Sequence, residues 1–406
     1  MTAQKRAEGI QSVPISITAV SSADIEQTHT LNLTGLQGSI PNVQIGTFTN
    51  TPNSAVFTIR GIGVIEPDPY AGQTVSVVVD GVPQYFNMVS LLNLFDVERI
   101  EILRGPQGTL FGANTTGGVI NVVTRQPTGE LGGRARVTLG NYDRLDVNAS
   151  FDFPVVQDLV AGKVSVVHSG RDGFVTNVVD GEDIDKLDTT ALRGYLKYSA
   201  DEHFDATLIA EYDRARNGAP LHIEASRPGE LGYVPEGTQP VGALYPQPPS
   251  PCVVPNERCH APDKYFGGNN GDGFSNMNAW SGTLTMNWNG DFAQVASVTG
   301  YKKFRLNEMT DQDGSALLLQ GTIRTTEAWQ FSQELRATLH PTDRFELLIG
   351  GFAMVDHYDQ IARYHLQFAA PNIRQDTTQD QDNWSGSVFT QAYWRITDRL
   401  RLQAGL

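Results

Sequence analysis

The chain has 406 residues, a formal net charge of −15, 18% charged residues and 9% aromatic residues. This balance is too apolar for intrinsic disorder, and the negative charge argues against a nucleic-acid partner, which needs a basic surface. No run approaches the ~18 apolar residues of a transmembrane helix, and Met1–Arg6 lacks the apolar core of a signal peptide. Composition alone therefore describes a soluble protein, a reading that the residue pattern below overturns.

Residues 1–127 predict a small α/β domain. Ser21 is a helix N-cap residue followed by acidic residues in the first turn, which indicates a short helix from this point. Three apolar runs bounded by Gly or Pro turns predict buried strands, and Met88–Leu94 predicts an apolar helical turn. The strand predictions cover Val75–Asp80, Arg99–Leu103 and Val119–Thr124.

From residue 128 to residue 406 the pattern changes to strict alternation. Leu145, Val147 and Ala149 alternate with polar residues, and the same period of two returns around Leu208 and Leu284. A period of two puts all apolar side chains on one face of a strand, as in a β-sandwich or in a membrane barrel with a wet lumen. Charged residues on the opposite face and aromatic residues at segment ends, such as Trp280 and Trp288, favour antiparallel strands of a transmembrane β-barrel.

The connections alternate between short and long, which is the asymmetry of outer-membrane barrels. About ten complete strands and an eleventh that starts at Arg399 are predicted. An open barrel edge in lipid is not viable, so we expect the chain to be a fragment. The short connections are Gly140–Arg144, Ala200–His203, Asn289–Asp291, Pro341–Arg344 and Thr397–Arg399, and the long ones are Arg171–Thr189, Arg214–Ala279, Arg305–Glu327 and Asp359–Trp384.

Cys252 and Cys259 lie in a Pro-rich segment. They are either two free thiols or a local disulfide, the latter if the chain is exported to an oxidising compartment. Ligand spacing for zinc is missing, and the acidic run Asp180–Asp185 lacks the order of a calcium loop, so a solvated loop is expected there. No metal site, cofactor or catalytic constellation is predicted, and the chain is not expected to be an enzyme.

Four segments carry a family resemblance. The stretch Val97–Arg125 (VERIEILRGPQGTLFGANTTGGVINVVTR) resembles the hallmark of TonB-dependent receptor plug domains. Phe57–Gly63 and Val77–Val82 are similar to two further plug signatures in the expected order, and Phe331–Arg336 is similar to a recurrent barrel-strand motif. The resemblance implies a plug inside a barrel of about 22 strands, of which this chain holds about 10–11.

The signature glycines permit tight turns and close backbone approach; they are Gly61, Gly105, Gly108, Gly112, Gly117 and Gly118. A phosphate-binding loop is the competing interpretation, but no Gly-Lys-Ser/Thr follows. By the resemblance, Arg60 and Arg104 lock the plug against lumen carboxylates, with Glu334 as the barrel candidate. The alternative is an ordinary solvated arginine at each strand end.

The resemblance also implies ligand contacts from plug loops that face outward. The candidates are Glu66, Asp68, Tyr70, Tyr85 and Phe86. For Tyr85 and Phe86, packing inside the protein is an equally good interpretation.

The implied function is active import of a scarce ligand across the Gram-negative outer membrane, energised by TonB with ExbB and ExbD. A ferric siderophore is the first candidate ligand, and cobalamin, haem, a saccharide or an aromatic compound are alternatives. A passive porin and a secreted β-sandwich module are the competing classes. Thr2–Arg6 resembles the stretch after a TonB box, so this box and a signal peptide are expected just upstream; the polypeptide as written is expected to accumulate in the cytoplasm.

Overall fold

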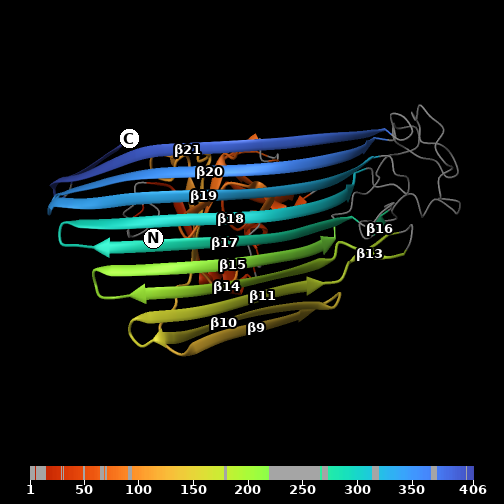
Figure 1. Ribbon diagram of the computed structural model, residues 1–406, viewed down its shortest axis with the longest axis horizontal. Helices are drawn as coiled ribbons and strands as arrows, with labels where there is room; N and C mark the ends of the chain where they lie inside the picture. Colours follow the sequence, from red (N-terminus) through yellow and green to blue (C-terminus); the bar gives the residue numbers. More distant parts are fainter. Residues whose placement is uncertain are drawn as a thin grey trace.

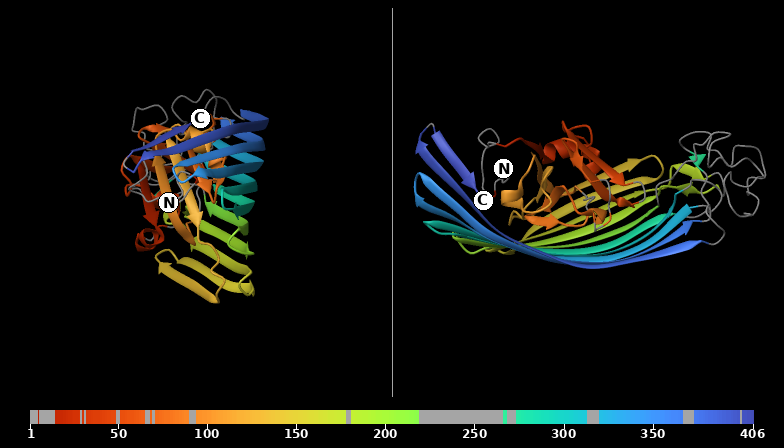
Figure 2. Two further views of the ribbon diagram at one scale, coloured as in Figure 1. Left: turned by 90° about the vertical axis from the view of Figure 1, so that its left-hand side faces the viewer. Right: turned by 90° about the horizontal axis from the view of Figure 1, so that it is seen from above.

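The protein consists of a small folded unit seated on the concave face of a large curved sheet (Figures 1 and 2). We call the first unit the plug, residues 15–124, and the large sheet the wall, residues 132–405. No helix in the described part is long and apolar enough to cross a membrane. The computed structural model describes residues 5, 15–28, 30, 32–48, 51–64, 68, 71–89, 94–177, 181–218, 266–267, 273–312, 320–366, 373–398 and 400–406.

The plug begins with β1 (Ile17–Ser21) and α1 (Ser22–Gln27). Ser21 caps this helix because its Oγ accepts from the Asp24 backbone N–H at 3.2 Å, while the Asp24 carboxylate accepts from the Ser21 N–H at 2.9 Å. These two hydrogen bonds form a capping box, which satisfies backbone donors that a helix start leaves open. The predicted helix is therefore present.

The main plug sheet has the order β1-β7-β8-β5-β6. Only β5 and β8 run parallel; the other pairs are antiparallel. Ile100, Ile102 and Ile120 have no exposed area, so the short apolar runs form a closed core, as predicted. The strands are β5 (Val75–Val79), β6 (Val82–Gln84), β7 (Val97–Arg104) and β8 (Gly118–Thr124).

A second plug sheet contains β2 (Val43–Phe48), β3 (Thr51–Ile59) and β4 (Ile62–Gly63). A two-residue turn joins β3 to β4. Arg60 and Gly61 both have positive φ, 53° and 80°, and Asp80 and Gly81 repeat this between β5 and β6 with 48° and 87°. Positive φ at both positions is the geometry of tight hairpin turns. Short helical turns complete the plug: η1 (Leu33–Leu36), η3 (Asn87–Val89) and α2 (Gly108–Phe111). Within the predicted turn Met88–Leu94, residues 90–93 lie outside the described part.

The wall is an antiparallel sheet of eleven strands whose neighbours follow the order of the chain. This agrees with the predicted antiparallel strands and their number. A small sheet of β12 (Val175–Asn177), β13 (Asp183–Ile184) and β16 (Phe266–Gly267) lies beyond one end of the wall (Figure 1). The wall strands are β9 (Gly132–Gly140), β10 (Arg144–Val156), β11 (Val160–Arg171), β14 (Leu187–Ser199), β15 (Phe204–Gly218), β17 (Phe274–Asn289), β18 (Ala293–Asp311), β19 (Gln320–Thr342), β20 (Phe345–Leu366), β21 (Arg374–Thr397) and β22 (Leu400–Gly405).

The wall places its polar face towards the plug and its apolar face outward. Lys163, Arg193 and Glu334 are buried on the plug side. On the opposite face large apolar side chains are exposed, among them Leu208, Leu335 and Val388. The alternation read from the sequence is thus present, in the sense expected for a wet interior and a lipid-facing exterior.

Three details of the wall differ from the prediction. The turn between β9 and β10 lies at the end of the wall that carries the long connections. There the Asp172 N–H, which follows β11, donates to the Tyr142 carbonyl at 2.9 Å. The sequence analysis did not predict the short turn at residues 157–159, which joins β10 to β11 at the opposite end of the wall. The predicted long connections are also too long: β18 runs to Asp311 and β19 starts at Gln320. Backbone pairing continues where apolar alternation has stopped, because ladder hydrogen bonds do not require apolar side chains.

Candidate functional site at the interface of plug and wall

One end of the plug is held to the wall through Asp68. Arg324 of β19 donates from Nη1 to Asp68 Oδ1 at 2.7 Å, and Gln360 of β20 donates to the same oxygen at 3.3 Å. Arg324 is only 8% exposed, so this contact is a nearly buried charge-assisted hydrogen bond. Of the predicted ligand contacts, Glu66 and Tyr70 lie outside the described residues.

Tyr85 and Phe86 pack against the wall. The Phe86 ring is 2% exposed and meets the Phe304 ring edge-on at 5.4 Å between centroids. Gln330 of β19 holds the same plug segment with both amide atoms: its Oε1 accepts from the Tyr85 N–H at 3.0 Å, and its Nε2 donates to the Pro83 carbonyl at 2.7 Å. In this geometry both side chains seat the plug, and a direct ligand contact stays a prediction.

Glu334 lies on the plug-facing side of β19 and is 5% exposed. Lys5 Nζ donates to its Oε2 at 2.9 Å, and Arg336 Nη1 donates to its Oε1 at 2.5 Å. Within the described part neither Arg60 nor Arg104 contacts it: Arg60 is exposed in its hairpin turn, and Arg104 donates to Thr18 Oγ1 at 2.6 Å. The locking role of these arginines therefore stays a prediction, whereas sequence reasoning did not identify Lys5.

A plug-to-wall lock of polarity opposite to the predicted arginine–glutamate lock lies at Asp96. Its carboxylate is 2.5 Å from Lys163 Nζ of β11 and 3.6 Å from Arg134 Nη2 of β9, and it accepts from Ser165 Oγ at 2.9 Å. Lys163 is fully buried and also donates to the Arg125 carbonyl at 2.7 Å. Here the plug supplies the anion and the wall supplies the cations. The available signal was a lysine at an inward position of a strand whose first seven residues are otherwise apolar or small.

Glycine is needed sterically where the plug chain passes closest to itself. A Cβ on Gly118 would lie 2.2 Å from the Leu103 carbonyl oxygen, and its φ is +152°. Any other residue would push β7 and β8 apart at their first pair.

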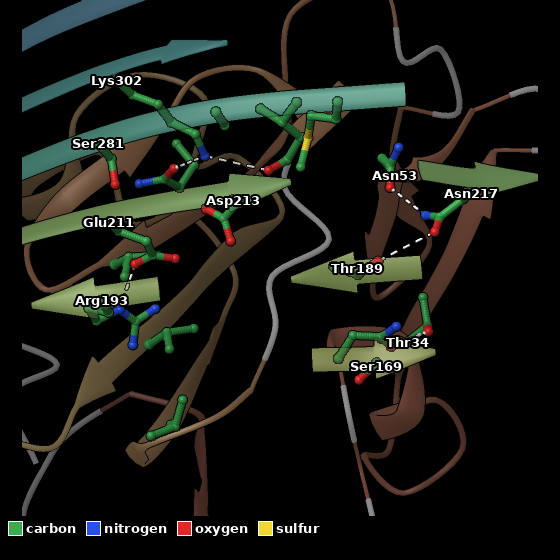
Figure 3. A pocket seen from close by; sticks show the side chains of 18 of the residues that line it. Thr34, Asn53, Ser169, Thr189, Arg193, Glu211, Asp213, Asn217, Ser281 and Lys302 are labelled. Carbon is green, nitrogen blue, oxygen red and sulfur yellow. Dashed lines mark hydrogen bonds and ion pairs between the residues drawn. The ribbon is translucent and has the colours of Figure 1, made fainter. Parts of the chain in front are cut away.

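A cavity of about 490 Å³ lies between the plug and strands β11 to β18 of the wall (Figure 3). Asn217 of β15 donates to Asn53 Oδ1 of the plug at 3.0 Å, and Asn53 donates to Ser275 Oγ of β17 at 2.8 Å. The two sides of the cavity are thus tied by amide hydrogen bonds.

Buried charges line the inner part of this cavity. Arg193 Nε donates to Glu211 Oε2 at 2.5 Å, and the Phe95 ring lies 4.7 Å from its guanidinium. Lys302 Nζ of β18 donates across to the plug, to Gln84 Oε1 at 2.7 Å and more weakly to the Val89 carbonyl at 3.4 Å. Such a bridge fixes the plug against this side of the wall.

Asp80 contributes a plug carboxyl to the cavity lining. Burial raises the pKa of Asp80, against the opposing effect of hydrogen bonds from the Thr124 N–H at 2.9 Å and the Thr124 hydroxyl at 2.7 Å. The charged form of this plug group is therefore less favoured than in water.

Comparison with known proteins agrees with this arrangement. Residues 9–119 match the family described as TonB-dependent Receptor Plug Domain. The chain thus carries a TonB-dependent receptor plug domain. It is 26% identical to the pesticin receptor of Yersinia enterocolitica over 96% of this chain and 59% of that protein, so it spans about three fifths of that relative.

Two solved structures share the fold. The ferric yersiniabactin uptake receptor FyuA from Yersinia pestis superposes with a TM-score of 0.70 at 16% identity, over 100% of this chain and 66% of that one. The ferripyoverdine receptor of the outer membrane of Pseudomonas aeruginosa gives 0.72 at 15% identity, over 100% and 53%. At these identities the likeness concerns the fold alone. The relatives are named as receptors and transporters rather than as enzymes.

Proposed function

We propose that the chain forms the plug and part of the wall of a receptor that imports a ferric siderophore across the outer membrane. The observation that carries this proposal is the inverted wall: polar on the plug side and apolar on the other, with a matched plug seated on it. A plug on a polar lumen face suits a wide barrel that must stay closed between transport events. The relatives named for ferric chelates support iron as the cargo.

The energy source belongs to the same proposal. A plug held by the Asp96–Lys163 ion pair and the Lys302–Gln84 hydrogen bond does not leave spontaneously, because breaking the buried contacts of charged groups is costly. Mechanical work from TonB, with ExbB and ExbD, supplies the energy to move the plug, which ligand binding alone does not supply. A passive porin is disfavoured, since such a channel needs no plug; cobalamin, haem, a saccharide or an aromatic compound remain alternative cargoes of the same receptor class.

Uptake in a deletion strain tests the proposal. Cells lacking the gene, with and without the whole receptor restored, are given ⁵⁵Fe as ferric trihydroxamate, triscatecholate and carboxylate chelates. We expect receptor-dependent uptake of at least one chelate that stops when tonB is also deleted. Uptake that persists without TonB supports the porin, and no receptor-dependent uptake of any chelate removes iron as the cargo.

A further inference from the structure

One histidine and three aspartates meet on the outer face of the wall, where β20 and β21 run side by side (Figure 1). The register pairs His357 with Asp382 and Asp359 with Asp380. Tyr358, between the two β20 positions, is 1% exposed and packs towards the plug. Since side chains alternate along a strand, the four residues share the opposite face, away from the plug.

This group lies at the edge of the apolar outer face. Trp384 comes two residues after Asp382 on the same face of β21 and is 82% exposed. Trp329 of β19 is paired in register with His357. Because aromatic side chains of this kind mark the border between a barrel and its membrane, we expect the group at the membrane surface. The site is therefore separate from the plug, which lies on the other side of the wall.

Three of these side chains place donor atoms around one point. His357 Nδ1 lies 2.9 Å from Asp382 Oδ1 and 3.9 Å from Asp380 Oδ1, and one donor atom from each residue lies within 4.8 Å of the other two. Two ligand atoms that share a tetrahedral ion at about 2.0–2.2 Å are roughly 3.4 Å apart, which falls between the two measured distances. The imidazole also stacks on the Trp329 ring, at 6.3 Å between centroids and 30° between planes. Small side-chain rotations would thus bring all three donors onto one ion.

The charges around this point favour a cation. Asp359 is paired in register with Glu327 on one side and with Asp380 on the other, and like charges directly opposite each other destabilise a sheet. Further along β21 the arrangement differs, because Asp376 accepts from Arg363 Nε at 3.2 Å. In the described part of the chain, the aspartates of the group contact no cationic side chain other than the histidine. An ion bound beside Asp380 would offset the repulsion between the paired carboxylates.

We propose that His357, Asp380 and Asp382 form a surface binding site for a divalent transition-metal ion such as Zn²⁺. One imidazole nitrogen with two carboxylate oxygens suits such an ion, whereas Ca²⁺ and Mg²⁺ prefer ligand sets made of oxygen alone. The bound ion joins β20 to β21 at the membrane surface, and three protein ligands leave a fourth position to water. The sequence analysis predicted no metal site, because His357 and Asp382 are 25 positions apart and meet only through strand pairing.

Zinc titration of the whole receptor tests the site. The purified, untagged receptor in detergent micelles is titrated with Zn²⁺ in competition with a chromophoric zinc chelator. His357→Gln and Asp382→Asn each remove one proposed ligand, and Asp380→Asn replaces either variant if it does not assemble. His168→Gln is the matched histidine control, because His168 also faces outward and contacts the Thr190 hydroxyl. Asp376→Asn is the matched carboxylate control, since this aspartate is already paired with arginine.

We expect the unmodified receptor and both controls to bind Zn²⁺ with the same Kd. Loss of one ligand should raise this Kd about tenfold or more, and bound Zn²⁺ should slow amide hydrogen exchange at residues 357–359 and 380–382. One Kd for all the proteins, or no binding below millimolar Zn²⁺, overturns the site. Displacement of Zn²⁺ by an equal concentration of Ca²⁺ overturns the metal class, and exchange that Zn²⁺ leaves unchanged overturns the joining of the two strands. The site does not depend on the cargo, so its failure leaves the import function standing.

Discussion

The plug and the wall are both β-structures, yet they place their apolar residues in opposite positions. In the plug, Ile102 and Leu103 are fully buried between sheet and neighbours. In the wall, Leu335 is 55% exposed on the outer face, while Glu334 beside it is 5% exposed towards the plug. One chain therefore buries its apolar side chains in the plug and exposes them on the outer face of the wall, a distribution that suits water around the plug and a membrane against the wall.

This contrast shows that polarity patterns report the surroundings and not the fold alone. Within the plug a buried charge is an exception. On the inner face of the wall buried charges are common, and several of them meet a partner on the plug or on a neighbouring strand, as in the pairs Arg193–Glu211 and Lys163–Asp96. Four substitutions probe the contrast, from the largest expected effect to the smallest.

Removal of the Lys163 ammonium should have the largest effect. Lys163→Met leaves the buried Asp96 carboxylate without its closest cation, and breaking a buried pair costs about 3–5 kcal/mol. We expect faster trypsin cleavage in the connection 125–131 between plug and wall. Lys303→Met, an exposed lysine on β18, is the control. Equal protection of both variants would show that Asp96–Lys163 does not hold the plug.

The same truncation should cost more in the plug than on the wall. Leu103→Ala opens a cavity in a closed core and should lower the free energy of unfolding by about 2–5 kcal/mol. Leu335→Ala on the exposed outer face creates no cavity and should cost clearly less. Urea unfolding of the two variants in the same detergent gives the comparison, and equal losses would contradict the contrast between the two regions.

A charge on the outer face tests whether that face lies in lipid. Leu208 of β15 is 46% exposed there, and Leu208→Arg should destabilise the membrane-inserted state by about 2–4 kcal/mol if it lies near the bilayer midplane. The readout is the folded fraction in lipid vesicles, with Leu208→Ile as the conservative control. Arginine tolerated as well as isoleucine would place this face in water.

The smallest effect is expected at the cap of α1. Ser21→Ala removes the Oγ acceptor of the Asp24 N–H and should cost about 1 kcal/mol of plug stability, whereas Ser22→Ala, inside the helix, should not. Hydrogen bonds from Ser21 lower the pKa of Asp24. The stabilisation that Asp24 contributes to the folded plug is therefore complete at pH values above the pKa of the unfolded state, about 4. It is lost as the pH falls through the lower pKa of the folded state. Thermal melts of both variants across this range check the sign.

Local features of the fold were readable from the sequence. The cap at Ser21, the strands around Val77 and Ile102, and the alternation around Leu208 each depend on residues close together in the chain, and all are present. The prediction was wrong where strand pairing extends beyond the apolar pattern, as at Asp311 and Gln320. Backbone hydrogen bonds between strands form there among polar residues, so the amino-acid pattern does not reveal them.

The interface was less readable, because its partners are far apart in sequence. Glu334 was identified as a buried carboxylate candidate, but its partner Lys5 is 329 positions away. Asp96 and Lys163 meet only because the plug folds back onto the wall, and no short motif contains both residues. The cavity is a property of two surfaces placed together, so neither segment alone encodes it.

Among the wall strands from β9 to β21, the length ranges from 9 residues in β9 to 24 in β21. A tilted strand needs only about 9–11 residues to cross a bilayer, so at about 3.3 Å per residue β21 is roughly 40 Å longer than the crossing requires. The rim is accordingly a slope, low at β9 and high at β21. A solute that diffuses along the cell surface therefore meets a high rim at β21 and a low rim at β9, so its approach is directional.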